Sequence, residues 1–116
     1  MKKYLVLYMA PAAGLEEWMK IDEEVRKGQE AEMKTAWDAW MEKNGAMFTG
    51  MTAGAGKTKR VTGDGVSEVK NDVMLFSIVE SDSHESLAEA FADHPHFGIP
   101  GAWIDIMPAN VLPGMQ

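Results

Sequence analysis

The stretch Val73-Met74-Leu75-Phe76-Ser77-Ile78-Val79-Glu80 decides the fold. It is short, almost entirely apolar, and rich in β-branched and aromatic side chains, a composition typical of a central strand. A turn signal, Lys70-Asn71-Asp72, precedes it. Ser81-Asp82-Ser83 follows it with side chains that commonly cap the start of a helix. We therefore predict a central strand over residues 73–80 and a helix immediately after it.

The chain that follows this strand predicts one helix and one last strand. The helix is indicated by a run of small and apolar residues: Leu87, Ala88, Ala90, Phe91 and Ala92. It is expected to end near Asp93, because the Pro- and Gly-rich segment 95–101 follows. Residues 102–107 alternate two sets of side chains, so Trp103, Asp105 and Met107 are expected on one face of a strand. Residues from 108 onward are expected to form a tail.

The chain before the central strand begins with a strand and a long helix. Residues 3–9 are a continuous apolar and aromatic run that ends before Pro11, which indicates a buried strand rather than a signal peptide. Residues 23–43 contain no proline, and Asp22 is a suitable N-cap for a helix there. One apolar face is predicted by helical spacing: Met33, Trp37, Trp40 and Met41. Gly28 costs about 1 kcal/mol relative to alanine, so a bend or fraying is expected at that point.

Three shorter segments complete the prediction. Residues 11–14 suggest a turn, and residues 15–20 either a short helix or an irregular lead-in to the long helix. Residues 46–52 are short and apolar, consistent with a strand. Residues 57–70 alternate polar and apolar side chains around the turn signal Gly63-Asp64-Gly65, which predicts a solvated hairpin arm.

The predicted order is β, α, β, an inserted hairpin, β, α, β. This order indicates an α+β fold, a ferredoxin-like βαββαβ domain that spans residues 1–116, with two helices on one face of an antiparallel sheet. The other face also needs a cover where it is apolar, and we expect a second copy of the chain to supply it.

The composition excludes several classes of partner. The hydrophobic fraction of 46% and the charged fraction of 25% are those of a globular protein. A net charge of −7 and a pI near 4.8 argue against binding to nucleic acid or to anionic membrane surfaces. The absence of cysteine from the sequence fits a reducing compartment, so a cytoplasmic location is expected.

The layout of the chain resembles a known family. The long helix between strands, the strand Asn71-Asp72-Val73-Met74-Leu75-Phe76-Ser77-Ile78-Val79-Glu80, and the closing His94-Pro95-His96-Phe97…Trp103-Ile104-Asp105-Ile106-Met107-Pro108 resemble the YCII-related (DGPF-like) proteins of the dimeric α/β-barrel superfamily. The resemblance covers most of residues 3–108. It implies a homodimer in which two ferredoxin-like sheets pack into a barrel, with a small-molecule cleft between sheet and helices.

The sequence departs from that family at two places. Many members carry a His-Asp pair whose histidine begins the first long helix, and here no histidine precedes position 84. A large subgroup has an Asp-Gly-Pro-Phe motif before the third strand, where this chain has Gly63-Asp64-Gly65-Val66. Both departures weaken the transfer of any catalytic role from the family.

The segment His94-Pro95-His96 is the main candidate for chemistry. Histidine titrates near neutral pH, so either His94 or His96 is a candidate general acid or base. Because a proline separates the two, we expect the rings to point to different sides, one into the cleft and the other toward the C-terminus of the preceding helix. The alternative interpretation is that both are ordinary polar loop residues. Asp105, between two apolar neighbours on its strand, is a candidate partner for one of them.

Five aromatic residues are candidates for contacting a ligand: Tyr8, Trp37, Trp40, Phe97 and Trp103. An aromatic face on a helix more often belongs simply to the core, and that alternative stays open for Trp37 and Trp40. Tyr8 lies near the end of the first strand, where its hydroxyl is available either to a ligand or to a core hydrogen bond.

No metal or cofactor is predicted. The pattern His-x-His lacks a third ligand, since His84 is expected roughly 15 Å away along the second helix. The segment 54–58, Gly-Ala-Gly-Lys-Thr, imitates part of a phosphate-binding loop but lacks the first glycine, because position 51 is Met. The basic residues Lys57, Lys59 and Arg60 indicate either a solvated strand edge or an anion-binding site at the mouth of the cleft.

Two functions follow from these observations. The first is a homodimeric protein that binds a small apolar or aromatic molecule between its helices and sheet. The alternative is an enzyme without a cofactor, of the isomerase, lyase or monooxygenase type, that uses His94 or His96 as general acid or base.

Overall fold

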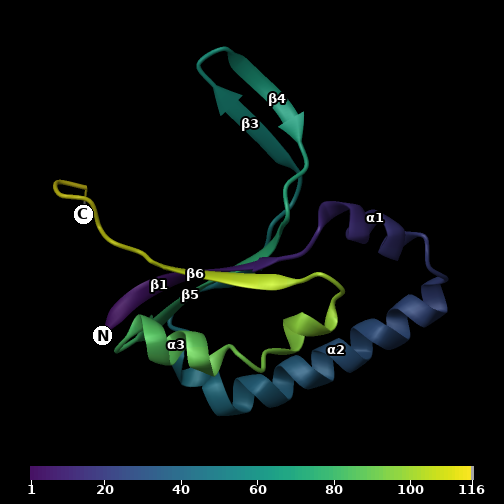
Figure 1. Ribbon diagram of the computed structural model, residues 1–116, viewed down its shortest axis with the longest axis horizontal. Helices are drawn as coiled ribbons and strands as arrows, with labels where there is room; N and C mark the ends of the chain where they lie inside the picture. Colours follow the sequence, from purple (N-terminus) through teal and green to yellow (C-terminus); the bar gives the residue numbers. More distant parts are fainter. Residues whose placement is uncertain (116) are drawn as a thin grey trace.

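A computed structural model describes residues 1–115 of the chain. Its main sheet has four strands, all antiparallel, in the order β2, β5, β1, β6 (Figure 1). The bounds of these strands are Lys2–Met9 for β1, Thr52–Gly54 for β2, Val73–Ser81 for β5 and Trp103–Pro108 for β6. Taken without the hairpin, this order is compatible with a ferredoxin-like fold. The α+β class and the antiparallel sheet are therefore confirmed.

The helices that cover the sheet lie on one of its faces, beneath it in Figure 1. They are α2 (Glu23–Asn44) and α3 (His84–Ala90), with the short 3₁₀ helices η1 (Gly45–Met47) and η2 (Pro95–Gly98), while α1 (Ala12–Met19) lies beyond the end of the sheet. α2 runs past the end of the sheet, and α1 connects it back to β1 (Figure 1). The long predicted helix is confirmed, and Gly28 does not interrupt it.

The ends of two helices are fixed by side chains. Asp22 caps α2, because its Oδ2 accepts a hydrogen bond from the backbone N–H of Glu24 at 3.1 Å. The N-terminus of α1 is held by a residue distant in sequence: Oδ1 of Asp72 accepts from the N–H of Ala12 at 2.9 Å. Residues 12–19 are therefore helical: the short-helix alternative for residues 15–20 is confirmed, and the turn expected over residues 11–14 is replaced by the first turn of α1.

The strand predicted over residues 46–52 exists but is misplaced, because only Thr52 of that range belongs to β2. α2 tightens into η1, in which Gly45 keeps a right-handed helical conformation with φ −60°, and β2 begins only at Thr52. The cause is the packing of the half-buried Phe48 against the core, where its ring lies 5.7 Å from that of Trp40 and 6.2 Å from that of Phe91. Packing against two helices thus replaces strand pairing in this segment.

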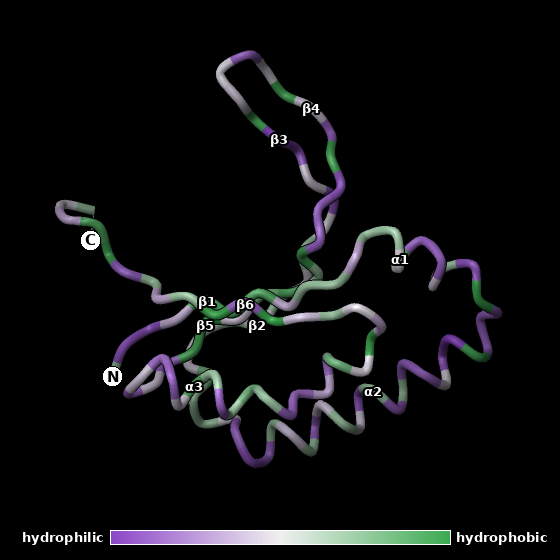
Figure 2. The backbone as a smooth tube through the Cα atoms, viewed as in Figure 1, coloured by the Kyte–Doolittle hydropathy of each residue, from purple (hydrophilic) through white to green (hydrophobic). Residues whose placement is uncertain are grey.

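The alternation of the strands gives the sheet two different faces. Tyr4, Val6 and Tyr8 of β1 are buried on the face that the helices cover, and they pair with Val79, Ser77 and Leu75 of β5. The intervening side chains point to the other side, which we call the open face. Among the described residues, no helix covers this face. Its half-buried apolar side chains are Leu5, Leu7, Phe76, Ile78 and Met107. Figure 2 shows the sheet as the region where hydrophobic colouring is concentrated.

The predicted hairpin is confirmed. β3 (Thr58–Thr62) and β4 (Gly65–Val69) form a separate two-stranded sheet that rises from the main sheet on the side opposite the helices (Figure 1). This projection explains a radius of gyration of 16.2 Å, where a compact domain of this length would have about 13 Å. The four-stranded sheet is open, with β2 and β6 at its edges, so it does not close into a barrel by itself.

Candidate functional site

The two candidate histidines lie in the turn between α3 and β6. Pro95 occupies the first turn of η2, where its missing N–H costs nothing, and His94 is the N-cap. The Nδ1 atom of His94 accepts a hydrogen bond from the backbone N–H of His96 at 2.9 Å. The sequence His-Pro-His therefore builds a capped 3₁₀ turn whose first ring is fixed by its own backbone.

Both imidazole rings point into the protein. His94 is 2% exposed and His96 is 1% exposed. Nε2 of His96 donates to the carbonyl oxygen of Met9 at 2.8 Å, which ties the turn to the end of β1. The expectation that the two rings point to different sides is therefore wrong. The tight 3₁₀ turn directs both rings toward Tyr8, whose ring centroid is 5.4 Å from that of His94 and 5.6 Å from that of His96.

Four aromatic side chains surround His94, and we call this group the aromatic cage: Tyr8, Trp37, Trp40 and Phe91. Phe91 stacks on the imidazole with an interplanar angle of 10°. Trp37 and Trp40 approach it at steep angles, with centroids at 4.3 and 4.5 Å. The sequence predictions for Tyr8, Trp37 and Trp40 thus converge on one place, which is also the centre of the core.

One polar atom in the cage has no hydrogen-bond partner. Because Nδ1 of His94 accepts from a backbone N–H, the neutral ring carries its proton on Nε2. Within residues 1–115, no atom accepts a hydrogen bond from this buried Nε2–H. Nearly all buried polar groups in folded proteins are paired, so this donor is available to an acceptor from outside the described residues.

A chain of hydroxyl groups leads from the cage to the sheet edge. The Tyr8 hydroxyl is 2.9 Å from Oγ of Ser77, which is in turn 2.7 Å from Oγ1 of Thr52 on β2. Tyr8 and Ser77 are fully buried, and Thr52 is exposed. Ser77 was not among the predicted site residues, although a single hydroxyl within an apolar strand was its visible signal. Phe91 was missed as a site residue because an apolar helix residue predicts only core packing.

Burial shifts the protonation of all three central groups toward the neutral form. The pKa of His94 is lowered to about 4, mainly by burial and also by nearby His96, while Asp93 acts in the opposite direction. Burial also lowers the pKa of His96, against the effect of its hydrogen bond to Met9. It raises the pKa of Tyr8 to about 12, although the hydrogen bond to Ser77 opposes this. At neutral pH the site therefore offers uncharged donors in an aromatic setting.

The remaining predicted residues lie elsewhere. Trp103 and Asp105 are on the open face, where Nε1 of Trp103 donates to Oδ2 of Asp105 at 3.3 Å. A pairing of Asp105 with His94 or His96 is therefore wrong within one protomer, because the sheet lies between them. Phe97 is 45% exposed and does not belong to the buried cage.

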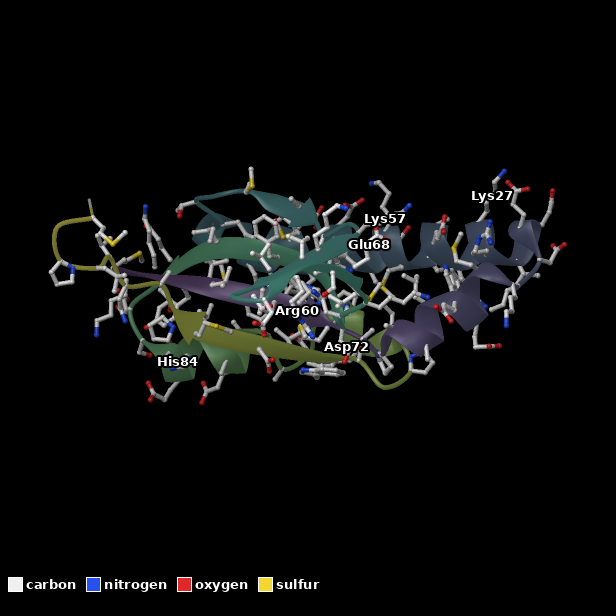
Figure 3. All side chains as sticks on the ribbon, turned by 90° about the horizontal axis from the view of Figure 1, so that it is seen from above. Lys27, Lys57, Arg60, Glu68, Asp72 and His84 are labelled. Carbon is white, nitrogen blue, oxygen red and sulfur yellow. The ribbon has the colours of Figure 1, made fainter. Side chains whose placement is uncertain are left out.

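The third histidine has a different environment. Nε2 of His84 donates to the carbonyl oxygen of Ile106 at 2.8 Å, which joins α3 to β6 (labelled in Figure 3). Two surface hollows lie near this end of the sheet, one lined in part by Lys43 and Glu80 and the other by Lys2 and His84. Neither is lined by the cage residues.

Residues 1–115 contain no group of three or more His, Asp or Glu side chains placed to hold a metal ion. The same residues contain no helix of the length and apolar character required to cross a bilayer. Comparison of the chain with models of known protein families and with curated proteins finds no match in either case.

Proposed function

We propose that this chain is a homodimeric protein that binds a small apolar or aromatic molecule carrying one hydrogen-bond acceptor. The observation that carries the proposal is the unpaired Nε2–H of His94 inside the aromatic cage. A buried donor without a partner costs about 1–3 kcal/mol. A ligand with a carbonyl or ether oxygen would recover that free energy and would place its apolar part against the surrounding rings.

Entry to the cage is supported by the exposure of one member. Trp37 is half-buried, whereas Tyr8, His94 and Phe91 are each at most 2% exposed. The ring of Trp37 lies 5.2 Å from that of Tyr8. Because Trp37 is itself partly exposed, it lies between the buried rings of the cage and the solvent. A change of rotamer at Trp37 would open the cage without moving the sheet.

The uncharged state of the cage favours binding over proton transfer. A histidine with a pKa near 4 is a weak base at neutral pH, so the alternative of an acid–base enzyme has less support from the geometry. A neutral N–H donor in an apolar setting, by contrast, is well suited to selecting an uncharged acceptor.

A matched pair of probes tests the binding proposal. Acetophenone and ethylbenzene have similar shapes and differ in a carbonyl oxygen, and each can be titrated while tryptophan fluorescence is recorded. We expect the wild-type protein to bind acetophenone roughly tenfold more tightly, from about one hydrogen bond. His94→Phe keeps an aromatic ring and removes the donor, so the preference should disappear. Equal binding of both probes by the wild type, or no binding of either, would contradict the proposal.

The homodimer, and the α/β barrel it would form, are supported by the open face. Leu5, Leu7 and Phe76 present a half-buried apolar surface on the side of the sheet away from the helices. Sheets with apolar residues on both faces normally pack against something on each side. A second copy placed sheet against sheet would cover this surface and complete a dimeric α/β barrel, as the resemblance noted above implies.

Sedimentation at micromolar concentration tests the dimer. We expect the wild type to sediment as a dimer and Leu7→Asp, on the open face, to sediment as a monomer. Leu15→Asp is the matched control, because Leu15 is 49% exposed on α1 and lies away from the sheet. A wild-type protein that is monomeric at micromolar concentration would contradict the dimer.

A further inference from the structure

The hairpin arm, residues 57–70, forms a sheet of its own, and an ion pair between Lys70 at its base and Glu16 of α1 joins it to the body of the same protomer. β3 and β4 pair only with each other, in a register that places Val61 directly opposite Val66. These two valines are 75% and 66% exposed. An isolated two-stranded hairpin is only marginally stable in water. An extended arm with two exposed apolar side chains at its centre therefore needs a surface to pack against.

The charge of the arm is opposite to that of the rest of the chain. Its four basic residues outnumber its two acidic ones, which gives a net charge of +2: Lys57, Lys59, Arg60 and Lys70 against Asp64 and Glu68. The whole chain carries −7, so the part outside the arm carries −9. Complementary charge favours encounter and docking between the arm and another copy of this acidic body.

The arm also stands on the side where a second copy would lie. It rises from the sheet away from the helices in Figure 1, and in Figure 3, seen from above, the arm with Arg60 lies in front of the sheet. The open face is on that same side. A second copy seated on the open face would therefore lie beside the arm.

We infer that the β3–β4 hairpin packs against the body of a second copy of the chain, with Val61 and Val66 buried in the contact. This inference rests on the proposed homodimer and adds to it a second contact region outside the sheet. Lys59 and Glu68 share the face of the two valines, and Arg60 and Ser67 lie on the reverse face. The reverse face of the same hairpin thus supplies a built-in control.

The dimer dissociation constant of two matched variants tests the inference. Val61→Asp places a carboxylate on the contacting face, and Ser67→Asp places the same carboxylate on the reverse face. Burial of one valine corresponds to more than a tenfold change in a binding constant. A dimer contains two arms, so we expect Val61→Asp to weaken dimerisation by about a hundredfold, with less than a threefold change for Ser67→Asp.

Circular dichroism of both variants checks that the body remains folded, since the arm forms a sheet of its own. The natural absence of cysteine allows a second measurement with single nitroxide labels. A label on Val61→Cys should lose mobility as the concentration rises through the dimer dissociation constant, and a label on Ser67→Cys should stay mobile.

The outcomes separate the arm contact from the dimer itself. If Leu7→Asp dissociates the dimer while Val61→Asp leaves its dissociation constant unchanged, the dimer stands and the arm contact is overturned. A label at Val61 that stays mobile in the dimer overturns it too. A monomeric wild type overturns both the dimer and the arm contact.

Discussion

The Nδ1 atom of His94 accepts the backbone N–H of His96 at 2.9 Å, and this one bond determines the chemistry of the site. It fixes the ring of His94 as the N-cap of η2 and places the remaining proton on Nε2, inside the aromatic cage. A loop position that could have served as an exposed base is thereby converted into a buried, neutral donor.

Stability should fall as the pH is lowered through the range in which these histidines titrate. The pKa of His94 is lowered to about 4 from 6.5, so the unfolded chain takes up its proton first. The stabilisation from burying the neutral ring is therefore complete above pH 6.5 and is lost as the pH falls to about 4. The loss from His94 should be about 3 kcal/mol, and His96 contributes in the same direction. Urea unfolding between pH 4 and pH 8 measures this dependence.

His94→Asn is the control for this pH dependence. Asparagine keeps an N-cap acceptor for the N–H of His96 but does not titrate. The slope of the unfolding free energy against pH should therefore decrease by about one proton in the variant. An unchanged slope would show that His94 does not carry the effect.

The chain of hydroxyl groups from Tyr8 to Thr52 predicts that two substitutions within it reduce the free energy of unfolding by different amounts. Tyr8→Phe removes one end of the chain, and Ser77 keeps its bond to Thr52 at 2.7 Å, so the cost should be about 1 kcal/mol. Ser77→Ala removes the middle and leaves the buried Tyr8 hydroxyl without its partner, which should cost about 1–3 kcal/mol. Chemical denaturation of the two variants gives the comparison. If Tyr8→Phe lowers the free energy of unfolding more than Ser77→Ala does, the proposed chain of hydrogen bonds is contradicted.

The elements predicted correctly are those in which the pattern is local. The apolar run at 73–80 and the helical spacing of Met33, Trp37 and Trp40 each contain their own evidence, and both elements are confirmed. The strand predicted over residues 46–52 was misplaced because the structure of this segment depends on the contact between Phe48 and Phe91, which are more than forty positions apart. Secondary-structure propensity depends on neighbouring residues in the sequence, so it cannot predict such a contact.

Only part of the candidate site was predicted, because the rest also depends on contacts that the local pattern does not show. The alternation of β6 correctly placed Trp103, Asp105 and Met107 on one face. Both faces of that strand carry large apolar side chains, however, so the sequence did not indicate which one meets the helices. The orientation of His96 was missed because it depends on the cap formed by His94, and neither helical nor strand periodicity describes a 3₁₀ turn.

The N-terminus of α1 should depend on Asp72. Its Oδ1 accepts from Ala12, and its own carbonyl oxygen accepts from the N–H of Ala10 at 2.9 Å. Asp72→Ala keeps the carbonyl bond and removes the side-chain acceptor, so we expect a loss of about 1 kcal/mol and faster amide exchange in α1. Asp72→Asn keeps an acceptor oxygen and should cost only a few tenths of a kcal/mol. Equal losses in both variants would assign the effect to charge rather than to the cap.

Two glycines should respond to alanine in opposite directions. At Gly50 the backbone lies so close beside β5 that an added Cβ would lie 2.7 Å from Cβ of Ile78. The two segments are joined there by hydrogen bonds from Gly50 N–H to the Ile78 carbonyl at 3.3 Å and from Ile78 N–H to the Met51 carbonyl at 3.2 Å. Gly50→Ala must separate these backbones, and we expect it to destabilise the protein by about 1–3 kcal/mol.

Gly28 is the matched control, because nothing lies within 4 Å of a Cβ added there and α2 continues through it. Gly28→Ala should therefore stabilise the protein by up to about 1 kcal/mol through helix propensity. Thermal unfolding of the two variants measures both signs. A stabilising Gly50→Ala would mean that β2 and β5 are not held at this separation. Since β2 also carries Thr52, the last hydroxyl of the chain that begins at Tyr8, a displaced β2 would also remove that hydrogen bond from the site.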